Sequence, residues 1–179
     1  MKDEIIIAGA GGQGVLALGK ILAEAAVEQG KNVSFYPSYG AEMRGGTTNC
    51  AVIISDEEIG SPTISKATSL IVMNTQSFNK FLPKLAKNGV LFYNSSMIEP
   101  EKAVESIGLR TYKIPATAIA QELGDVRCAN MALLGAYTGV KKTVTAESAQ
   151  KIISAAFSKK PEVVKLNIEA FNRGLKEIK

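Results

Sequence analysis

Hydrophobic and polar positions along the chain form short apolar runs that alternate with longer amphipathic stretches. Short apolar runs bounded by turn residues are typical of buried strands, whereas apolar positions three and four residues apart are typical of helices. The predicted strands are residues 4–8, 32–37, 50–55, 70–74, 90–94 and 110–114. The predicted helices are residues 12–29, 78–86, 99–106, 116–123, 128–137, 146–157 and 161–177. This order predicts an α/β fold in which helices connect the strands.

The alternation changes at two places. The predicted strands at 32–37 and 50–55 have no helix between them, which predicts an antiparallel excursion from an otherwise parallel sheet. Beyond residue 116 the predicted helices follow one another, and in the last of them Val164, Ile168 and Phe171 begin an apolar stripe. We therefore predict one domain over residues 1–179, with a Rossmann-like three-layer α/β/α architecture, a largely parallel sheet and a helical C-terminal third.

A glycine-rich turn, AGAGGQG at residues 8–14, follows the first predicted strand. Gly9, Gly11 and Gly14 match the pattern G-x-G-x-x-G, which between a strand and a helix is typical of phosphate binding. Gly9 would permit the tight turn, Gly11 would let the backbone approach an anion, and Gly14 would let the helix pack against the strand. We predict that Gly9, Gly11, Gly12 and Gly14 hold a phosphate group. The alternative is a structural corner without a ligand.

A dinucleotide-binding enzyme also needs an acidic residue at the end of the second strand, about 20 residues beyond the glycines, to bind the ribose hydroxyls. The corresponding stretch here, VSFYPSYG, contains no acid, and Glu42 is the first one to follow. The sequence therefore disfavours NAD and FAD. An independent nucleotide-binding dehydrogenase stays as the alternative hypothesis.

Composition excludes several chemistries. The chain has no histidine, and its two cysteines, Cys50 and Cys128, lie far apart. Histidine-dependent catalysis, a histidine-ligated metal site and an iron–sulfur cluster within this chain are thereby excluded, and we predict no catalytic residue and no metal site. The net charge of +4 comes without a nucleic-acid-binding pattern. No apolar run approaches the roughly 18 to 20 residues that cross a membrane, and no signal peptide is visible, so we expect a cytoplasmic protein.

Polar and aromatic residues near the ends of predicted strands are further candidates. Asn74, Asn94 and Ser95 follow parallel strands, where α/β sheets place ligands, although they could also cap the next helices. Tyr36 and Tyr39 are candidates for interface aromatics or for core packing.

Six stretches together resemble one known family. They are IAGAGGQGVLALGKILAEAA, FYPSYGAEMRGGTTNCAVIIS, VMNTQSFNKF, VLFYNSS, IPATAIAQELG and CANMALLGA. In this order, and over nearly the whole chain, they resemble the gamma subunit of the 2-oxoacid:ferredoxin (acceptor) oxidoreductases of anaerobic metabolism. The resemblance implies that 2-oxoacid, coenzyme A and oxidised ferredoxin are converted to acyl-CoA, CO2 and reduced ferredoxin.

The resemblance also implies a division of labour between subunits. Alpha and beta subunits would bind thiamine diphosphate and Mg2+, and a ferredoxin-like delta subunit would carry iron–sulfur clusters. This chain would be inactive alone, would pack against the thiamine-binding subunits and would hold no cofactor except, at the glycine turn, coenzyme A as a co-substrate. The stretch MRGGTTNC resembles gamma subunits assigned to 2-oxoglutarate or branched-chain 2-oxoacids more than those assigned to pyruvate.

The loop that contains this stretch is the predicted interface. Tyr39, Glu42, Arg44, Gly45 and Gly46 are its candidate residues, because the Arg44 guanidinium offers a fixed fork of donors and the two glycines permit close approach by another chain. The alternative for Arg44 is an ion pair with Glu42 inside the loop. The sequence leaves open the stoichiometry of the complex and whether the isolated chain forms a homodimer.

Overall fold

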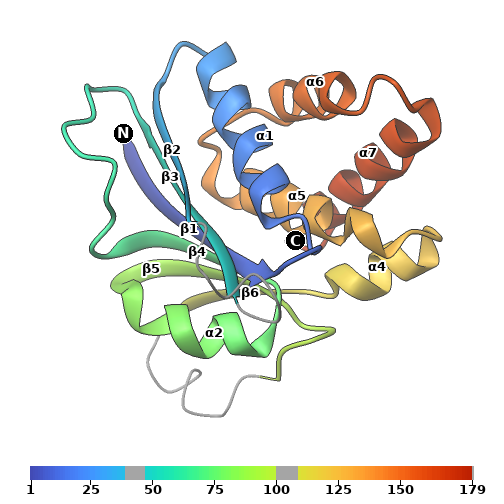
Figure 1. The fold of residues 1–179 in the computed structure, drawn as a ribbon, viewed down its shortest axis with the longest axis horizontal. Coiled ribbons are helices and arrows are strands. Elements are labelled where there is room, and N and C mark those ends of the chain that lie inside the picture. Colours follow the sequence, from blue (N-terminus) through green and yellow to red (C-terminus); the bar gives the residue numbers. More distant parts are fainter. Residues whose placement is uncertain (39–46, 100–108, 179) are drawn as a thin grey trace.

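The computed structural model describes residues 1–38, 47–99 and 109–178, which form one mixed sheet with helices on both faces (Figure 1). The strands are β1 (Lys2–Ala10), β2 (Asn32–Ser38), β3 (Thr47–Ser55), β4 (Ala67–Val72), β5 (Leu85–Asn94) and β6 (Arg110–Ile114). The α-helices are α1 (Val15–Glu28), α2 (Thr75–Phe81), α4 (Ala116–Glu122), α5 (Ala129–Lys141), α6 (Ala146–Ala156) and α7 (Pro161–Lys176). Two short 3-10 helices are η1 (Leu82–Lys84) and η2 (Val126–Cys128).

The strand order is β2-β3-β1-β4-β5-β6. The strands β1, β4, β5 and β6 pair in parallel, whereas β3 runs antiparallel to both of its neighbours, β1 and β2. The prediction of a largely parallel sheet with an antiparallel excursion is confirmed. The sequence did not show that β3 lies between β1 and β2, which separates the ends of those two strands by two strand spacings, about 10 Å.

The two faces of the sheet bury different layers. Ile5 and Ile7 of β1 point into a large core formed with α1, α5 and the other C-terminal helices, and Ile6 and Ala8 point into a smaller core with α2. Figure 1 shows α1 and α4–α7 on one side of the sheet and α2 on the other. Successive residues of a strand face opposite ways, so one short apolar run supplies both cores. The predicted three-layer α/β/α fold is confirmed.

Helix boundaries differ from the prediction, most clearly in α1 and α2 and at the end of α5, which reaches Lys141 instead of residue 137. The first helix begins at Val15 instead of residue 12, because Gly12 and Gly14 have positive φ angles of 88° and 74°, which lie outside the helical region. The helix predicted at 78–86 is α2, which starts earlier because the Asn74 side chain caps it, and η1 follows it before β5 begins. The helix predicted at 99–106 lies outside the described residues except for its first position.

Glycines bring the helices α5 and α7 into close contact. A Cβ atom on Gly135 would lie 2.0 Å from the carbonyl oxygen of Phe171, and one on Gly174 would lie 1.9 Å from that of Ala132. Only glycine permits two helix backbones to approach so closely. This contact fixes α5, whose first turn borders the glycine-rich turn.

Candidate functional site

The glycine-rich turn lies at the carboxyl end of β1, beside the carboxyl ends of β4 and β5. Within it, a Cβ atom on Gly9 would lie 2.8 Å from the Gln13 Oε1 and Val15 Cγ2 atoms, so Gly9 is needed for the tight turn. Gly11 is exposed, and a Cβ there would meet nothing nearer than Thr48 Oγ1 at 4.0 Å. The chain's own packing therefore explains Gly9 but does not require Gly11.

Gly14 has a different role from the predicted one. A Cβ atom on Gly14 would lie 2.3 Å from the Asn130 Nδ2 atom, and this Nδ2 donates a hydrogen bond to the Gly14 carbonyl oxygen at 3.0 Å. The close approach of helix to strand occurs instead at Gly19, where a Cβ would lie 2.5 Å from the Cys50 Sγ atom. The sequence signal for Gly19 was a glycine on the apolar face of a predicted helix.

Side chains from two elements hold the turn in place. The Gln13 Oε1 atom accepts hydrogen bonds from the Ala10 backbone N–H at 2.7 Å and from Asn74 Nδ2 at 3.1 Å. The Asn74 Oδ1 atom accepts from the Ser77 N–H at 2.8 Å and thereby caps α2. Both the Nδ2 and the Oδ1 atoms of Asn74 are thus hydrogen-bonded within the chain. This agrees with the alternative that Asn74 caps the next helix.

Asn94 is also engaged within the chain. It is buried at the end of β5, where its Nδ2 donates to the Thr117 Oγ1 atom at 2.8 Å and to the Met73 carbonyl oxygen at 3.3 Å. Its Oδ1 accepts from the Ser96 and Thr117 N–H groups, both at 3.3 Å. The Ser95 N–H donates to the Ile114 carbonyl oxygen at 2.8 Å. These residues join the ends of β5 and β6 to α4.

A hollow of about 300 Å³ opens beside the glycine-rich turn at the same edge of the sheet. It is lined by Gly12, Gln13, Met73, Met97, Thr117, Val126, Arg127 and Ala129. Met97 and Val126 are 47% and 57% exposed and give the border of the hollow an apolar character. An apolar hollow with a few polar groups at its border is typical of a binding site. We define this hollow together with residues 9–14 as the carboxyl-edge site.

Arg127 at this site is held by Asp125. The Arg127 Nε atom lies 2.9 Å from Asp125 Oδ1, and Nη2 lies 2.7 Å from Oδ2. These hydrogen bonds lower the pKa of Asp125 from 3.8 to about 2, so the pair is fully charged at neutral pH. Sequence patterns did not single out Arg127 and Val126, for which the available signal was an apolar residue next to an arginine between two predicted helices.

The predicted interface residues Tyr39, Glu42, Arg44, Gly45 and Gly46 lie outside the described residues. Tyr36, which is described, is 56% exposed on the face of β2 that points away from α1. Core packing is therefore the wrong interpretation of Tyr36.

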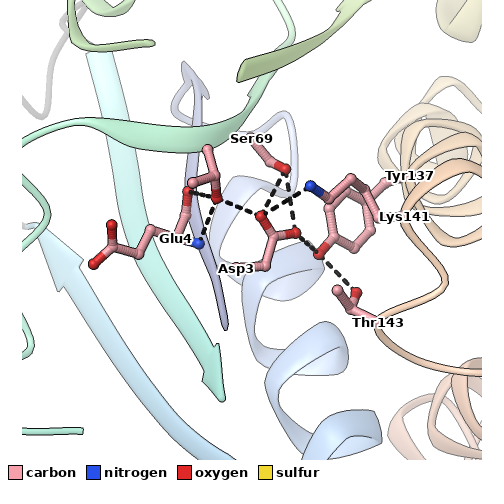
Figure 2. A network of polar contacts seen from close by, with 7 residues as sticks. Asp3, Glu4, Ser69, Tyr137, Lys141 and Thr143 are labelled. Carbon is pink, nitrogen blue, oxygen red and sulfur yellow. Dashed lines mark hydrogen bonds and ion pairs between the residues drawn. The ribbon is translucent and has the colours of Figure 1, made fainter. Parts of the chain in front are cut away.

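A buried polar cluster lies at the opposite edge of the sheet, at the start of β1 (Figure 2). The Asp3 carboxylate accepts hydrogen bonds from Tyr137 OH at 2.7 Å and Ser69 Oγ at 3.0 Å, and the Lys141 Nζ atom lies 3.3 Å from it. Tyr137 OH also shares a hydrogen bond of 2.7 Å with Thr143 Oγ1. Burial raises the pKa of Tyr137 well above its ordinary value. Because Asp3 and Tyr137 are almost fully buried, a substrate cannot reach them, and the cluster joins α5 to the sheet.

The cysteines are buried, and burial raises the pKa of the Cys50 thiol to about 12 and also raises that of Cys128. Both thiols are therefore protonated and unreactive at neutral pH.

In the part of the chain that the structure describes, no three His, Cys, Asp or Glu side chains are grouped so as to hold a metal ion. The described helices include none that is long and apolar enough to span a membrane.

Comparison with known proteins identifies relatives over almost the whole chain. Residues 4–177 match the family model described as pyruvate ferredoxin/flavodoxin oxidoreductase. The chain is 37% identical to the ketoisovalerate oxidoreductase subunit VorA of Methanothermobacter marburgensis over 94% of its own length, but it spans only 35% of that relative. It is 35% identical to the 2-oxoglutarate synthase subunit KorC of Methanocaldococcus jannaschii, with 97% of this chain and 92% of the relative covered.

Solved structures agree with these matches. The keto/oxoacid ferredoxin oxidoreductase gamma subunit from Geobacter sulfurreducens is 30% identical, with 98% of both chains covered and a TM-score of 0.79. The 2-oxoglutarate:ferredoxin oxidoreductase from Magnetococcus marinus, which has 2-oxoglutarate, coenzyme A and succinyl-CoA bound, is 26% identical with a TM-score of 0.89. This match covers 99% of the present chain and 31% of the Magnetococcus chain.

Proposed function

The chain belongs to the pyruvate ferredoxin/flavodoxin oxidoreductase family, and on that premise we propose that it is the cytoplasmic gamma subunit of a thiamine diphosphate-dependent 2-oxoacid:ferredoxin oxidoreductase. The relatives covered over more than nine tenths of their length include a subunit of 2-oxoglutarate synthase and a keto/oxoacid ferredoxin oxidoreductase gamma subunit. In the longer relatives the matching region is about a third of the chain, so there it is joined to further sequence. The resemblance noted in the sequence is thus confirmed at the level of the family.

In this proposal the chain does not catalyse the reaction alone. Thiamine diphosphate and Mg2+ belong to the alpha and beta subunits, and iron–sulfur clusters belong to a ferredoxin-like delta subunit. Support comes from the carboxyl-edge site, whose described residues offer backbone N–H groups, apolar side chains and one paired arginine. The Asp3 carboxylate is buried at the opposite edge, and Lys141, the basic group of that cluster, is paired with it. The role left for the chain is to bind and orient.

The ligand proposed for the carboxyl-edge site is the phosphate-rich part of coenzyme A. Gly9, Gly11, Gly12 and Gly14 form a turn at the start of α1, where N–H groups without helical partners and the helix dipole favour an anion. The observation that carries the proposal is the open space at Gly11, because a larger residue would fit the fold there. The neighbouring apolar hollow can receive a less polar part of the same ligand.

The substrate is proposed to be 2-oxoglutarate or a branched-chain 2-oxoacid. Support comes from the named relatives, a ketoisovalerate oxidoreductase at 37% identity and a 2-oxoglutarate synthase at 35%. Pyruvate synthase subunits are also related, at 33% identity for the one from Methanocaldococcus jannaschii. Because these identities are so close, the choice of oxoacid needs an assay.

The test is purification of the native complex through an affinity tag on this chain, under anaerobic conditions from its own host. We expect thiamine-binding and ferredoxin-like subunits to co-purify. The preparation should reduce ferredoxin with coenzyme A and 2-oxoglutarate or 2-ketoisovalerate, and faster than with pyruvate.

An independent dehydrogenase would instead give a single active chain that binds NAD tightly, and this result would overturn the proposal. The fold disfavours it for a second reason beyond the missing acid. Since β3 lies between β1 and β2, the end of β2 is about 10 Å from the glycine-rich turn, too far for a side chain there to bind the ribose of a dinucleotide held by that turn.

A further inference from the structure

In the part of the chain that the structure describes, β2 and β3 have a helix on only one face. Phe35 of β2 and Cys50 of β3 point into the large core with α1, so the alternate positions on these strands, such as Tyr36 and Ala51, point to the other face. The small core under α2 is formed by residues of β1, β4 and β5, and no residue of β2 or β3 belongs to it. On this face Ile53 is buried, whereas Tyr36 is 56% exposed. Exposed aromatic residues of this kind are enriched in protein interfaces.

A groove of about 220 Å³ lies between this face of β2 and β3, residues 62–64 and the end of α2. It is lined by Ile6, Tyr36, Ser38, Asn49, Ala51, Pro62, Thr63, Ile64, Phe81 and Lys84. We call it the β2–α2 groove. The β2 and β3 side of the groove has both apolar and polar residues, such as Tyr36 and Asn49. On the α2 side, the Lys84 Nζ atom lies 5.6 Å from the centroid of the Phe81 ring. The groove therefore joins an apolar contact surface to a positive charge.

The segment from residue 59 to residue 98, which supplies part of the groove lining, carries only positive charges. The sequence contains no aspartate or glutamate from residue 59 to residue 98, whereas lysines stand at 66, 80, 84 and 87. Ala67 pairs with Leu85 across the sheet, so Lys66 and Lys84 are neighbours, and Lys66 Nζ donates to the Pro83 carbonyl oxygen at 2.8 Å. Among the described residues, neither Lys66 nor Lys84 forms an ion pair with a carboxylate. Glu4, which faces the same side of the sheet, is already paired with Lys2 at 2.8 Å.

We propose that the β2–α2 groove binds an acidic segment of a partner subunit. This inference rests on the proposed function, because it requires a multi-subunit complex. Carboxylates of the segment contact Lys66 and Lys84, and an apolar side chain next to them packs against Tyr36. Charge complementarity selects this occupant over a second copy of the same chain, since a two-fold contact would bring the lysines of both copies together. Nucleic acid fits less well, because residues 59–98 contain no arginine.

The experiment uses the intact complex, purified through this chain. A zero-length carbodiimide cross-linker joins a lysine amine to a carboxylate in direct contact, and mass spectrometry of the digested complex identifies both residues. We expect Lys84 or Lys66 to be joined to an aspartate or glutamate of another subunit. A double variant, Lys66→Glu with Lys84→Glu, should weaken retention of that subunit by about tenfold, with less effect of salt on what remains. Lys159→Glu, an exposed lysine beyond α6, is the matched control and should change nothing.

Four outcomes would overturn the inference. Cross-links from Lys66 and Lys84 only to other copies of this chain would assign the groove to self-association. Full retention of every subunit by the double variant would show that the lysines do not bind a partner. If no partner subunit co-purifies at all, both the groove inference and the proposed function fail. If an active complex is obtained but its cross-links lie away from Lys66 and Lys84, the groove inference fails and the proposed function stands.

Discussion

Asn130 of α5 donates a hydrogen bond from its Nδ2 atom to the carbonyl oxygen of Gly14 at 3.0 Å. These residues are 116 positions apart, and their contact sets the position of the glycine-rich turn against the C-terminal helices. The same carbonyl oxygen accepts the Leu18 N–H at 2.9 Å, so one atom serves both the helix and the tertiary contact. A phosphate-binding turn works only when its N–H groups are held in a fixed direction, and Asn130 contributes to this rigidity.

Replacing this side chain should loosen the turn. Asn130→Ala removes a hydrogen bond in a buried setting but leaves the Gly14 carbonyl oxygen bonded to the Leu18 N–H, so it is expected to lower the free energy of unfolding by about 0.5–1.5 kcal/mol. Urea denaturation followed by circular dichroism measures this change. Asn79→Ala, an exposed substitution on α2, is the control and should leave stability nearly unchanged. Equal stabilities for the two variants would show that the Asn130 contact contributes little.

The open space at Gly11 gives a kinetic prediction. Gly11→Val should leave the chain folded and the complex assembled, because its Cβ has room, but the side chain should obstruct a phosphate-rich ligand. In the complex we expect the KM for coenzyme A to rise several-fold and the KM for the 2-oxoacid to stay the same. Gly60→Val, at another open glycine, is the control. An unaltered KM for coenzyme A in a normally assembled Gly11→Val complex would mean that the turn is a structural corner only.

The loop that includes Arg44 gives a prediction about assembly, argued from its sequence alone. Arg44→Ala and Gly45→Val should leave the isolated chain folded but weaken its association with the thiamine-binding subunits, because distinctive residues in a polar loop are better explained by an external contact. Quantitative pull-down from co-expressing cells measures the association. Stoichiometric recovery of all subunits with full ferredoxin reduction by both variants would contradict the interface role.

The contact between α5 and α7 should tolerate no side chain. Gly135→Ala and Gly174→Ala each place a methyl group about 2 Å from a backbone oxygen, and neither backbone can move without shifting a helix. We expect each variant to lose about 3 kcal/mol of stability, at the upper end for overpacked sites. Thermal denaturation tests this against Gly60→Ala, which adds the same methyl group in open space. Similar melting temperatures for all three variants would show that the two helices separate easily.

The Asp125–Arg127 pair predicts a pH dependence. In the folded chain the pKa of Asp125 is about 2 instead of 3.8, so the pair contributes stability that is fully present above about pH 4 and is lost as the pH falls toward 2. The difference in unfolding free energy between the parent and Asp125→Asn should therefore shrink over that range. Denaturant titrations at pH 6, 4 and 2.5 provide the comparison. A difference that stays constant with pH would show that the ion pair does not stabilise the fold.

The sequence by itself determined those features of the protein that depend on interactions between residues close together in the chain. The order of strands and helices, the antiparallel excursion and the need for glycine at the turn depend on the hydrophobic period and on local backbone geometry, which neighbouring residues express. The helix boundaries were less accurate, because a side-chain cap such as Asn74 and positive φ angles at Gly12 and Gly14 depend on contacts that a period does not show. The family resemblance was carried by motifs spread over nearly the whole chain.

Only the tertiary structure decided what these residues meet. The sequence could not show that β3 lies between β1 and β2, that Gly14 faces Asn130 while Gly19 approaches Cys50, or that Val126 and Arg127 border the glycine-rich turn. It equally could not show that Asp3 and Tyr137, 134 residues apart, share a buried hydrogen bond. Each of these contacts joins segments far apart in the chain, and local propensity carries no information about which distant residue will fill a given space. The physical reason is that helices and strands form from local periods, whereas a site forms where the folded layers happen to bring their ends together.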